Sequence, residues 1–182
     1  MAIWELRCGS VNDFAMLVPR DRHDIEEDAF DTDGKPKDWM DRPLVGFSID
    51  KRKKVMKPRA DVSLFVPGAL VLNERARDAL GEFLGRFGQL LELDCSGEVL
   101  YFFNATRIVS CVDKSRSEKF EDGGVMLESF EESKAPTEAA VFKDPLTAPV
   151  RIYVNDAGKT EIERIAVDAS LTGIECGTPR PL

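Results

Sequence analysis

The residues that most often carry chemistry in proteins are sparse in this sequence. Its one histidine, His23, has no second histidine at metal-ligand spacing and no cysteine pair near it, so a zinc site would lack ligands. As a general base, His23 has no serine or cysteine beside it in the sequence, although such partners need only meet in space. We interpret His23 as an exposed loop residue and predict no catalytic residue, no metal site and no cofactor.

The sequence Asp31-Thr32-Asp33-Gly34 is similar to the middle of a calcium-binding EF-hand loop. If Gly34 takes the sixth position of that loop, Ala29 takes the first ligand position and Met40 the twelfth. Neither side chain can bind Ca²⁺, so calcium binding is not predicted.

Phosphate chemistry is no better supported. The basic run at 51–59 has no aromatic residues between its bases, as a single-strand binding surface would require, and we interpret it as a solvated loop. The sequence Gly85-Arg86-Phe87-Gly88 lies at the end of a predicted helix, whereas phosphate binds at a helix start. Function is therefore expected to reside in a surface that binds another molecule.

Acidic residues gather in two segments. Positions 21–33 hold seven acids against one arginine, a net charge of −6, and positions 118–132 hold six acids against one lysine, a net charge of −5. The whole chain carries −8, so the remainder is net positive at +3. Clustered charge steers an oppositely charged partner, whereas a like-charged run can also be a solvated loop. Both interpretations of the first segment stay open.

The predicted partner-binding residues come from these two segments, with one tryptophan added. From the first segment they are Asp24, Glu26, Glu27, Asp28, Asp31 and Asp33. From the second they are Glu121, Asp122, Glu128, Glu131 and Glu132. Trp39 is either an aromatic anchor of the interface, since tryptophan is common at binding hot spots, or a lid over the core of the sheet.

Composition indicates a soluble globular protein. With 182 residues and 43% hydrophobic residues, the chain can form one substantial core. Its acidity disfavours nucleic acid and anionic membranes as partners and favours a basic protein. The apolar stretch 64–72 is too short to cross a bilayer, and the N-terminus does not have the apolar core of a secretory signal.

Cysteine usage points to the cytoplasm. The four cysteines, Cys8, Cys95, Cys111 and Cys176, are far apart and form no C-x-x-C pair. At this density a disulfide framework is not expected, and free cysteines behave as small apolar residues. We expect reduced thiols in a cytoplasmic protein.

The clearest element is a helix over 74–87. Asn73 can cap its first turn, and apolar residues recur along one face at helical spacing. Gly88 is placed to end it. A second helix is predicted to begin with a capping box formed by Thr160 and Glu163, and to stop at Gly173.

Short strand-like runs surround these helices. Runs 89–95 and 98–104, joined by Ser96-Gly97, predict a β-hairpin. Other predicted strands are 3–6, 14–18, 107–112, 125–127, 140–142, 150–154 and 174–176. The whole predicts an α+β domain with a mostly antiparallel mixed sheet of short strands and two main helices. Residues 1–59 form its loop-rich N-terminal part, 60–176 its core, and 177–182 a flexible tail.

Eight short motifs follow one another in the core segment. They are Ala60-Asp61-Val62, then Leu70-Val71-Leu72-Asn73-Glu74-Arg75-Ala76, Leu90-Leu91-Glu92-Leu93, Leu100-Tyr101-Phe102-Phe103-Asn104, Ile108-Val109-Ser110-Cys111-Val112-Asp113, Ser115-Arg116-Ser117-Glu118, Ile152-Tyr153-Val154 and Leu171-Thr172-Gly173-Ile174-Glu175. This order resembles the bacterial polymorphic-toxin immunity proteins of the immunity protein eleven type, formerly a domain of unknown function. The resemblance covers residues 60–176 and is weak before residue 60, where the acidic loop must be interpreted by itself.

The resemblance implies a single α+β domain that is encoded beside a toxin and blocks it in the cytosol of the producing bacterium. It implies no catalytic residues. We therefore expect a non-enzymatic immunity protein that binds and neutralises a cognate secreted antibacterial toxin, whose toxic domain would be basic if it is a nuclease. The alternative is an adaptor or chaperone that loads an effector for secretion. An enzyme that reverses toxin damage fits least well.

Overall fold

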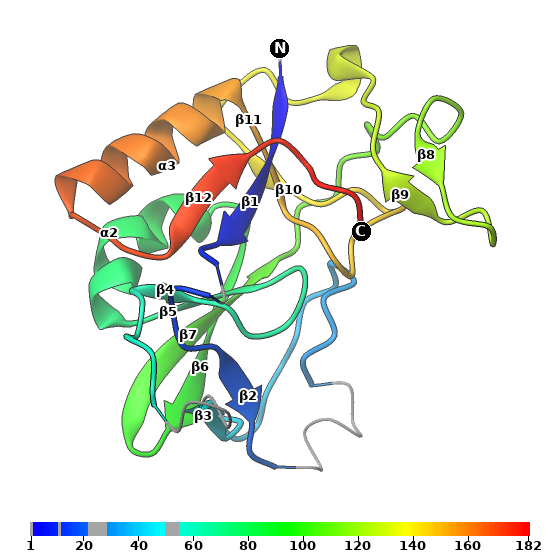
Figure 1. Cartoon of the computed structure of the whole chain (residues 1–182). Helices are drawn as coiled ribbons and strands as arrows, with labels where there is room; N and C mark the ends of the chain where they lie inside the picture. Colours follow the sequence, from blue (N-terminus) through cyan, green and yellow to red (C-terminus); the bar gives the residue numbers. More distant parts are fainter. Residues whose placement is uncertain (1, 11, 22–28, 50–54) are drawn as a thin grey trace.

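Two four-stranded antiparallel sheets and two helices make up the body of the protein (Figure 1). The computed structural model describes residues 2–10, 12–21, 29–49 and 55–182. The first sheet has the order β10-β11-β1-β12. Its strands are Val141–Phe142 (β10), Tyr153–Asn155 (β11), Ile3–Cys8 (β1) and Ile174–Gly177 (β12). The second sheet has the order β4-β5-β7-β6. Its strands are Val62–Ser63 (β4), Leu70–Leu72 (β5), Glu98–Ala105 (β7) and Gly88–Cys95 (β6).

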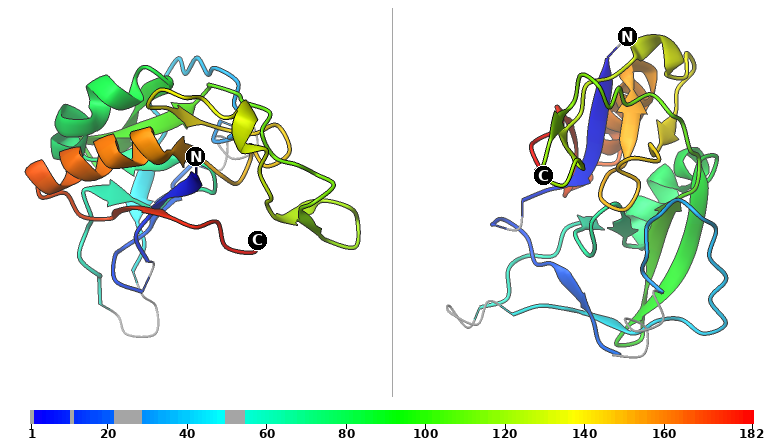
Figure 2. Two further views of the ribbon diagram at one scale, coloured as in Figure 1. Left: turned by 90° about the horizontal axis from the view of Figure 1, so that it is seen from above. Right: turned by 90° about the vertical axis from the view of Figure 1, so that its right-hand side faces the viewer.

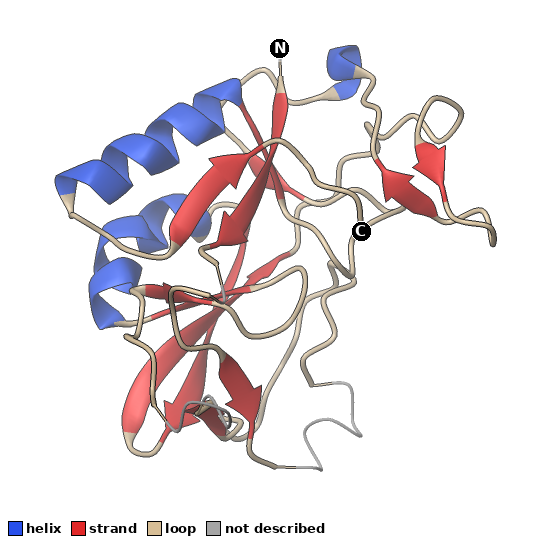
Figure 3. Ribbon diagram, in the orientation of Figure 1, coloured by secondary structure: helices blue, strands red, loops and turns tan. Residues whose placement is uncertain are grey.

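Two small two-stranded sheets and one short 3-10 helix are the remaining regular elements of the described residues (Figure 3). The small sheets pair β2 (Leu17–Pro19) with β3 (Val45–Phe47), and β8 (Glu118–Lys119) with β9 (Val125–Leu127). The helices are α2 (Glu74–Leu84), α3 (Asp156–Asp168) and the short 3-10 helix η1 (Glu132–Lys134). Every pair of these named strands is antiparallel, so the predicted α+β class with a mostly antiparallel sheet is confirmed.

Helix α2 forms where the sequence predicts it. The Asn73 side chain accepts a hydrogen bond from the amide of Ala76, as expected for a helix cap. The helix ends at Leu84, three residues earlier than predicted, with Gly85 as its C-terminal cap. Gly88 does not end the helix; it begins β6, where a Cβ would lie 2.2 Å from the carbonyl oxygen of Asn104. This glycine is needed because two strands approach closely.

The start of the second helix was predicted wrongly. Helix α3 begins at Asp156, capped by Asn155, and Thr160 lies inside it with its hydroxyl donating to the Asp156 carbonyl. Asn155 caps the helix in place of Thr160 because the Asn155 side chain is fully buried and makes four hydrogen bonds. The helix also ends earlier than predicted, at Asp168, and Gly173 (φ +80°) serves the turn into β12 instead.

The β6–β7 hairpin is confirmed, with all eight residues of each strand in register. Ser96 and Gly97 both take positive φ angles (56° and 89°), the geometry of the turn that joins such strands most tightly. The predicted strand 107–112 is reduced to two isolated bridges, at Ile108 and Val112. The predicted strands 14–18 and 150–154 are replaced by the three-residue strands β2 and β11, each of which overlaps the predicted range by two residues and ends one residue beyond it.

Two hydrophobic clusters lie on opposite faces of the second sheet. Successive residues of β7 point to opposite sides, so Phe103 belongs to the cluster under the helices and Phe102 to the cluster beneath the N-terminal segments. The four cysteines are free thiols, and burial raises the pKa of Cys8, Cys111 and Cys176 to about 12. In the described ranges, none of the helices combines the length and apolarity required to cross a bilayer.

Replacing Asn155 by alanine tests where α3 begins. Its side chain accepts hydrogen bonds from the amides of Ala140 and Gly158 and donates to the carbonyls of Pro136 and Glu138. We expect N155A to lower the free energy of unfolding by about 3 kcal/mol, because a cap is lost and buried groups remain unpaired. Urea denaturation measures this.

The matched control is T160A, at the residue predicted to cap the helix, for which we expect a change of about 0.5 kcal/mol or less. Equal effects of the two substitutions would show that the assigned helix start is wrong.

Candidate functional site: a protruding acidic hairpin

Strands β8 and β9 form a hairpin that projects from the body of the protein (Figure 2). Glu118 pairs with Leu127 and Lys119 with Val125, with a bulge between the two pairs. A projecting arm of this kind can reach into a concave surface on another molecule.

The tip of the hairpin is held in one conformation by its own hydrogen bonds. The amide of Phe120 donates to the carbonyl of Gly124 at 2.9 Å, and the amide of Gly123 donates to the carbonyl of Phe120 at 3.0 Å. The Asp122 carboxylate accepts a hydrogen bond from the Gly124 amide at 2.9 Å. Gly123 has a φ of +85°, which favours glycine. Glu121 and Asp122 therefore present charge from an ordered turn.

An exposed aromatic ring accompanies these two acids. Phe120 is 42% exposed, whereas Phe102 and Phe103 in the sheet are fully buried. The exposed fraction matters because aromatic residues are enriched at protein interfaces relative to the rest of the surface. The hairpin tip thus combines an apolar contact with two carboxylates.

The base of the hairpin is fixed through Asp113 and Ser117. The Ser117 hydroxyl donates to the Asp113 carbonyl at 2.7 Å. It also accepts from the Ser129 amide at 3.0 Å, and this hydrogen bond joins the segment before β8 to the segment after β9. Hydrogen bonds from the Ser115 hydroxyl and the Arg116 guanidinium hold the pKa of the Asp113 carboxyl well below its usual range. Asp113 is therefore a constant negative charge that organises the loop before β8.

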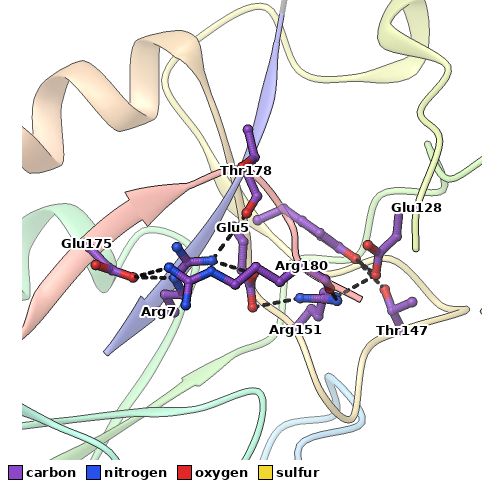
Figure 4. A network of polar contacts seen from close by, with 9 residues as sticks. Glu5, Arg7, Glu128, Thr147, Arg151, Glu175, Thr178 and Arg180 are labelled. Atoms are coloured by element: carbon purple, nitrogen blue, oxygen red, sulfur yellow. Dashed lines mark hydrogen bonds and ion pairs between the residues drawn. The ribbon is translucent and has the colours of Figure 1, made fainter. Parts of the chain in front are cut away.

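A buried ion pair joins the hairpin to the first sheet (Figure 4). The carboxylate of Glu128, just after β9, accepts hydrogen bonds from Arg151 Nε at 2.6 Å and from the Tyr153 hydroxyl at 2.9 Å. Arg151 also pairs with Glu5 of β1 at 2.8 Å. The Thr147 hydroxyl lies 2.8 Å from that of Tyr153. Burial, followed by the charge of Glu128, raises the pKa of Tyr153 far above its usual range, so this hydroxyl stays protonated and donates.

Glu128 is thus a correction to the predicted partner-binding set. Its side chain is 0% exposed and that of Arg151 is 3% exposed, so Glu128 cannot meet a partner while this ion pair is intact. The acidic run 118–132 gave no sign of this, because the partner arginine lies 23 residues further along the chain. Glu128 holds the hairpin in place and does not form part of its binding face.

The structure places the other predicted residues in several settings. Asp24, Glu26, Glu27 and Asp28 lie outside the described residues, as does His23. Glu121 and Asp122 come together at the exposed tip, while Glu131 pairs with Lys134 at 2.8 Å and the exposed Glu132 begins η1. Asp31 and Asp33 lie on a separate segment, where a hydrogen bond from Lys35 lowers the pKa of Asp33.

Trp39 closes the second hydrophobic cluster. Its ring packs against Phe30 and Phe102, with ring centroids 5.8 Å and 5.4 Å away, and its Nε1 donates to the Ala29 carbonyl at 3.2 Å. The structure therefore favours the interpretation of Trp39 as a lid over the core, and not as an interface anchor.

One chemically notable residue, Lys143, was not singled out from the sequence. It is fully buried, and its ammonium donates to the carbonyls of Thr32 (2.9 Å), Gly68 (2.7 Å) and Ala148 (2.6 Å). Burial lowers its pKa to about 7, and the nearby carboxylates of Asp31 and Asp33 act in the opposite direction. All three donors are occupied by backbone, so Lys143 clamps three loops together and is not arranged as a nucleophile.

Two surface grooves carry charged rims without a reactive group. One, of about 340 Å³, lies between α2 and α3 and is flanked by the ion pair of Glu161 with Arg164. The other, of about 320 Å³, lies between Trp39 and β6 and is flanked by the ion pair of Arg42 with Glu92. Within the described ranges, no group of three or more histidine, cysteine, aspartate or glutamate side chains is placed to hold a metal ion.

Comparison with known proteins adds no assignment. No protein-family model matches the sequence, and no curated protein matches it. The candidate site therefore depends on the geometry of the hairpin.

Truncation of Glu128 tests its role as the anchor of the hairpin. We expect E128A to lower the free energy of unfolding by about 3 kcal/mol, because it removes one partner of a buried ion pair and leaves donors of Arg151 and Tyr153 unpaired. Chemical denaturation gives the value. The control is E131A in the same acidic segment, whose exposed pair with Lys134 should be worth less than about 1 kcal/mol. A loss for E128A no larger than that for E131A would contradict the anchor role.

Proposed function

We propose that this chain is an immunity protein that binds a cognate secreted antibacterial toxin in the cytoplasm and neutralises it without catalysis. The observation that carries the proposal is the projecting hairpin, whose ordered tip exposes Phe120, Glu121 and Asp122. The resemblance of residues 60–176 to the immunity protein eleven type supplies the class of partner.

An ordered tip favours tight binding because little conformational entropy is lost on association. Each side chain or loop that must be ordered at an interface costs free energy, and a turn already closed by three hydrogen bonds avoids part of that cost. The ring of Phe120 would fill an apolar depression on the toxin. Glu121 and Asp122 would contact basic residues around it.

The charge of the tip favours a basic partner such as a nuclease toxin. Carboxylates on an arm can occupy the place of substrate phosphates in a basic cleft and accelerate the encounter. Such steering weakens as salt is added, since the Debye length falls from about 30 Å at 0.01 M to about 10 Å at 0.1 M. Electrostatic steering would therefore be recognised by an association rate that falls as salt is added.

Co-expression with the toxic domain encoded by the neighbouring gene tests the proposal. We expect the wild-type chain to restore growth and to bind that domain, and the variants F120A and E121K/D122K to lose protection. For E121K/D122K the association rate at low salt should fall by about tenfold or more.

The matched control is D78K/E82K, which makes the same charge change on the exposed face of α2 and should leave protection intact. Binding without restored growth would favour the adaptor function. Restored growth without binding would favour an enzyme that repairs the damage.

A further inference from the structure

The last five residues cross the body and end beside the hairpin (Figure 1). They follow β12, the edge strand of the first sheet, and the amide of Leu182 donates to the carbonyl of Met126 in β9 at 3.0 Å. The sequence predicts a flexible tail here, whereas the structure gives this segment contacts along its length. The chain end and the hairpin are therefore in direct contact.

Backbone atoms of the tail make these contacts. Arg7 Nη1 donates to the Thr178 carbonyl at 3.2 Å, and Arg151 Nη2 donates to the Arg180 carbonyl. By contrast, the Arg180 side chain makes only a 3.7 Å ion pair with Glu175, and it is 70% exposed. The hydrogen bonds between the tail and the two arginines are therefore made by the main chain of the tail.

Arg151 connects the tail to the hairpin anchor (Figure 4). Each nitrogen of its guanidinium serves a different part of the chain: Nε binds Glu128, Nη1 binds Glu5 and Nη2 binds the Arg180 carbonyl. If the tail leaves, Nη2 loses its acceptor and water gains access to the ion pair. Water screens charge, so the bond between Arg151 and Glu128 should weaken as well.

We propose that residues 178–182 are a latch that fixes the β8–β9 hairpin to the body, directly through Leu182 and indirectly through Arg151 and Glu128. While the latch is closed the hairpin is one rigid unit with the first sheet. When it is open the hairpin moves independently and the rest of the fold persists. The latch follows from contacts within the chain alone, so it does not rest on the proposed function.

Amide hydrogen exchange in a chain lacking residues 178–182 tests the latch. The reporters are the amides of Phe120, Ser129 and Glu131, which are hydrogen-bonded within or at the base of the hairpin. We expect them to exchange at least about tenfold faster than in the full chain, since two restraints on the hairpin are lost. The ladder amides between β6 and β7 should exchange at the same rate in both chains.

Two point variants sharpen the comparison. R180A removes the tail's charged side chain but keeps the carbonyl that Arg151 binds, so hairpin exchange should not change. L182P removes the amide that donates to Met126 and replaces the half-exposed leucine side chain, but it keeps the carbonyl that Arg151 binds, so it should accelerate the hairpin amides by less than the full deletion. Hairpin exchange that is unchanged by the deletion would overturn the proposal. Acceleration of the β6–β7 amides by the same factor as the hairpin would overturn it too, because the tail would then stabilise the whole fold.

Discussion

The buried ion pair between Arg151 and Glu128 is the interaction on which the hairpin depends. Two charges lose their water in this site, which is unfavourable unless hydrogen bonds satisfy the remaining donors and lone pairs. Among the described residues, Oε2 of Glu128 is buried without a hydrogen-bond partner, so the ion pair depends on the contacts made to Oε1 and to the guanidinium. Here the guanidinium is shared among Glu128, Glu5 and a backbone carbonyl of the tail, while Tyr153 donates to the same carboxylate. Because these groups come from four distant parts of the chain, satisfying them fixes the position of the hairpin on the first sheet.

This constraint separates the acidic residues by role. The charge of Glu128 is buried inside the protein, where it is paired with Arg151. The charge of Glu131 is partly neutralised by Lys134. The carboxylates of Glu121 and Asp122 remain exposed at the tip, carried by a turn whose backbone hydrogen bonds are already made. A negative arm that needs little ordering is suited to rapid and specific capture of a basic protein surface.

Local elements were predictable from the sequence, whereas long-range polar contacts were not. Helix α2 and the β6–β7 hairpin follow from a cap at Asn73, apolar periodicity and a two-residue turn, all of which lie within a few residues of one another. The start of α3 was wrong because the capping box at Thr160 is a local pattern and the burial of Asn155 is not. At the site, the tip acids were predicted, but Glu128 was misassigned and Lys143 overlooked, since their partners lie far away in sequence.

A preformed binding surface requires that the free protein hold the hairpin as rigidly as its core. Backbone order parameters from ¹⁵N relaxation test it most directly, measured from Glu118 to Leu127 and, for reference, along β7 in the same sample. We expect values near 0.85 in both segments, as for rigid backbone. Values below about 0.6 in the hairpin, with a rigid β7, would show that the buried ion pair does not fix the arm and would contradict a preformed binding surface.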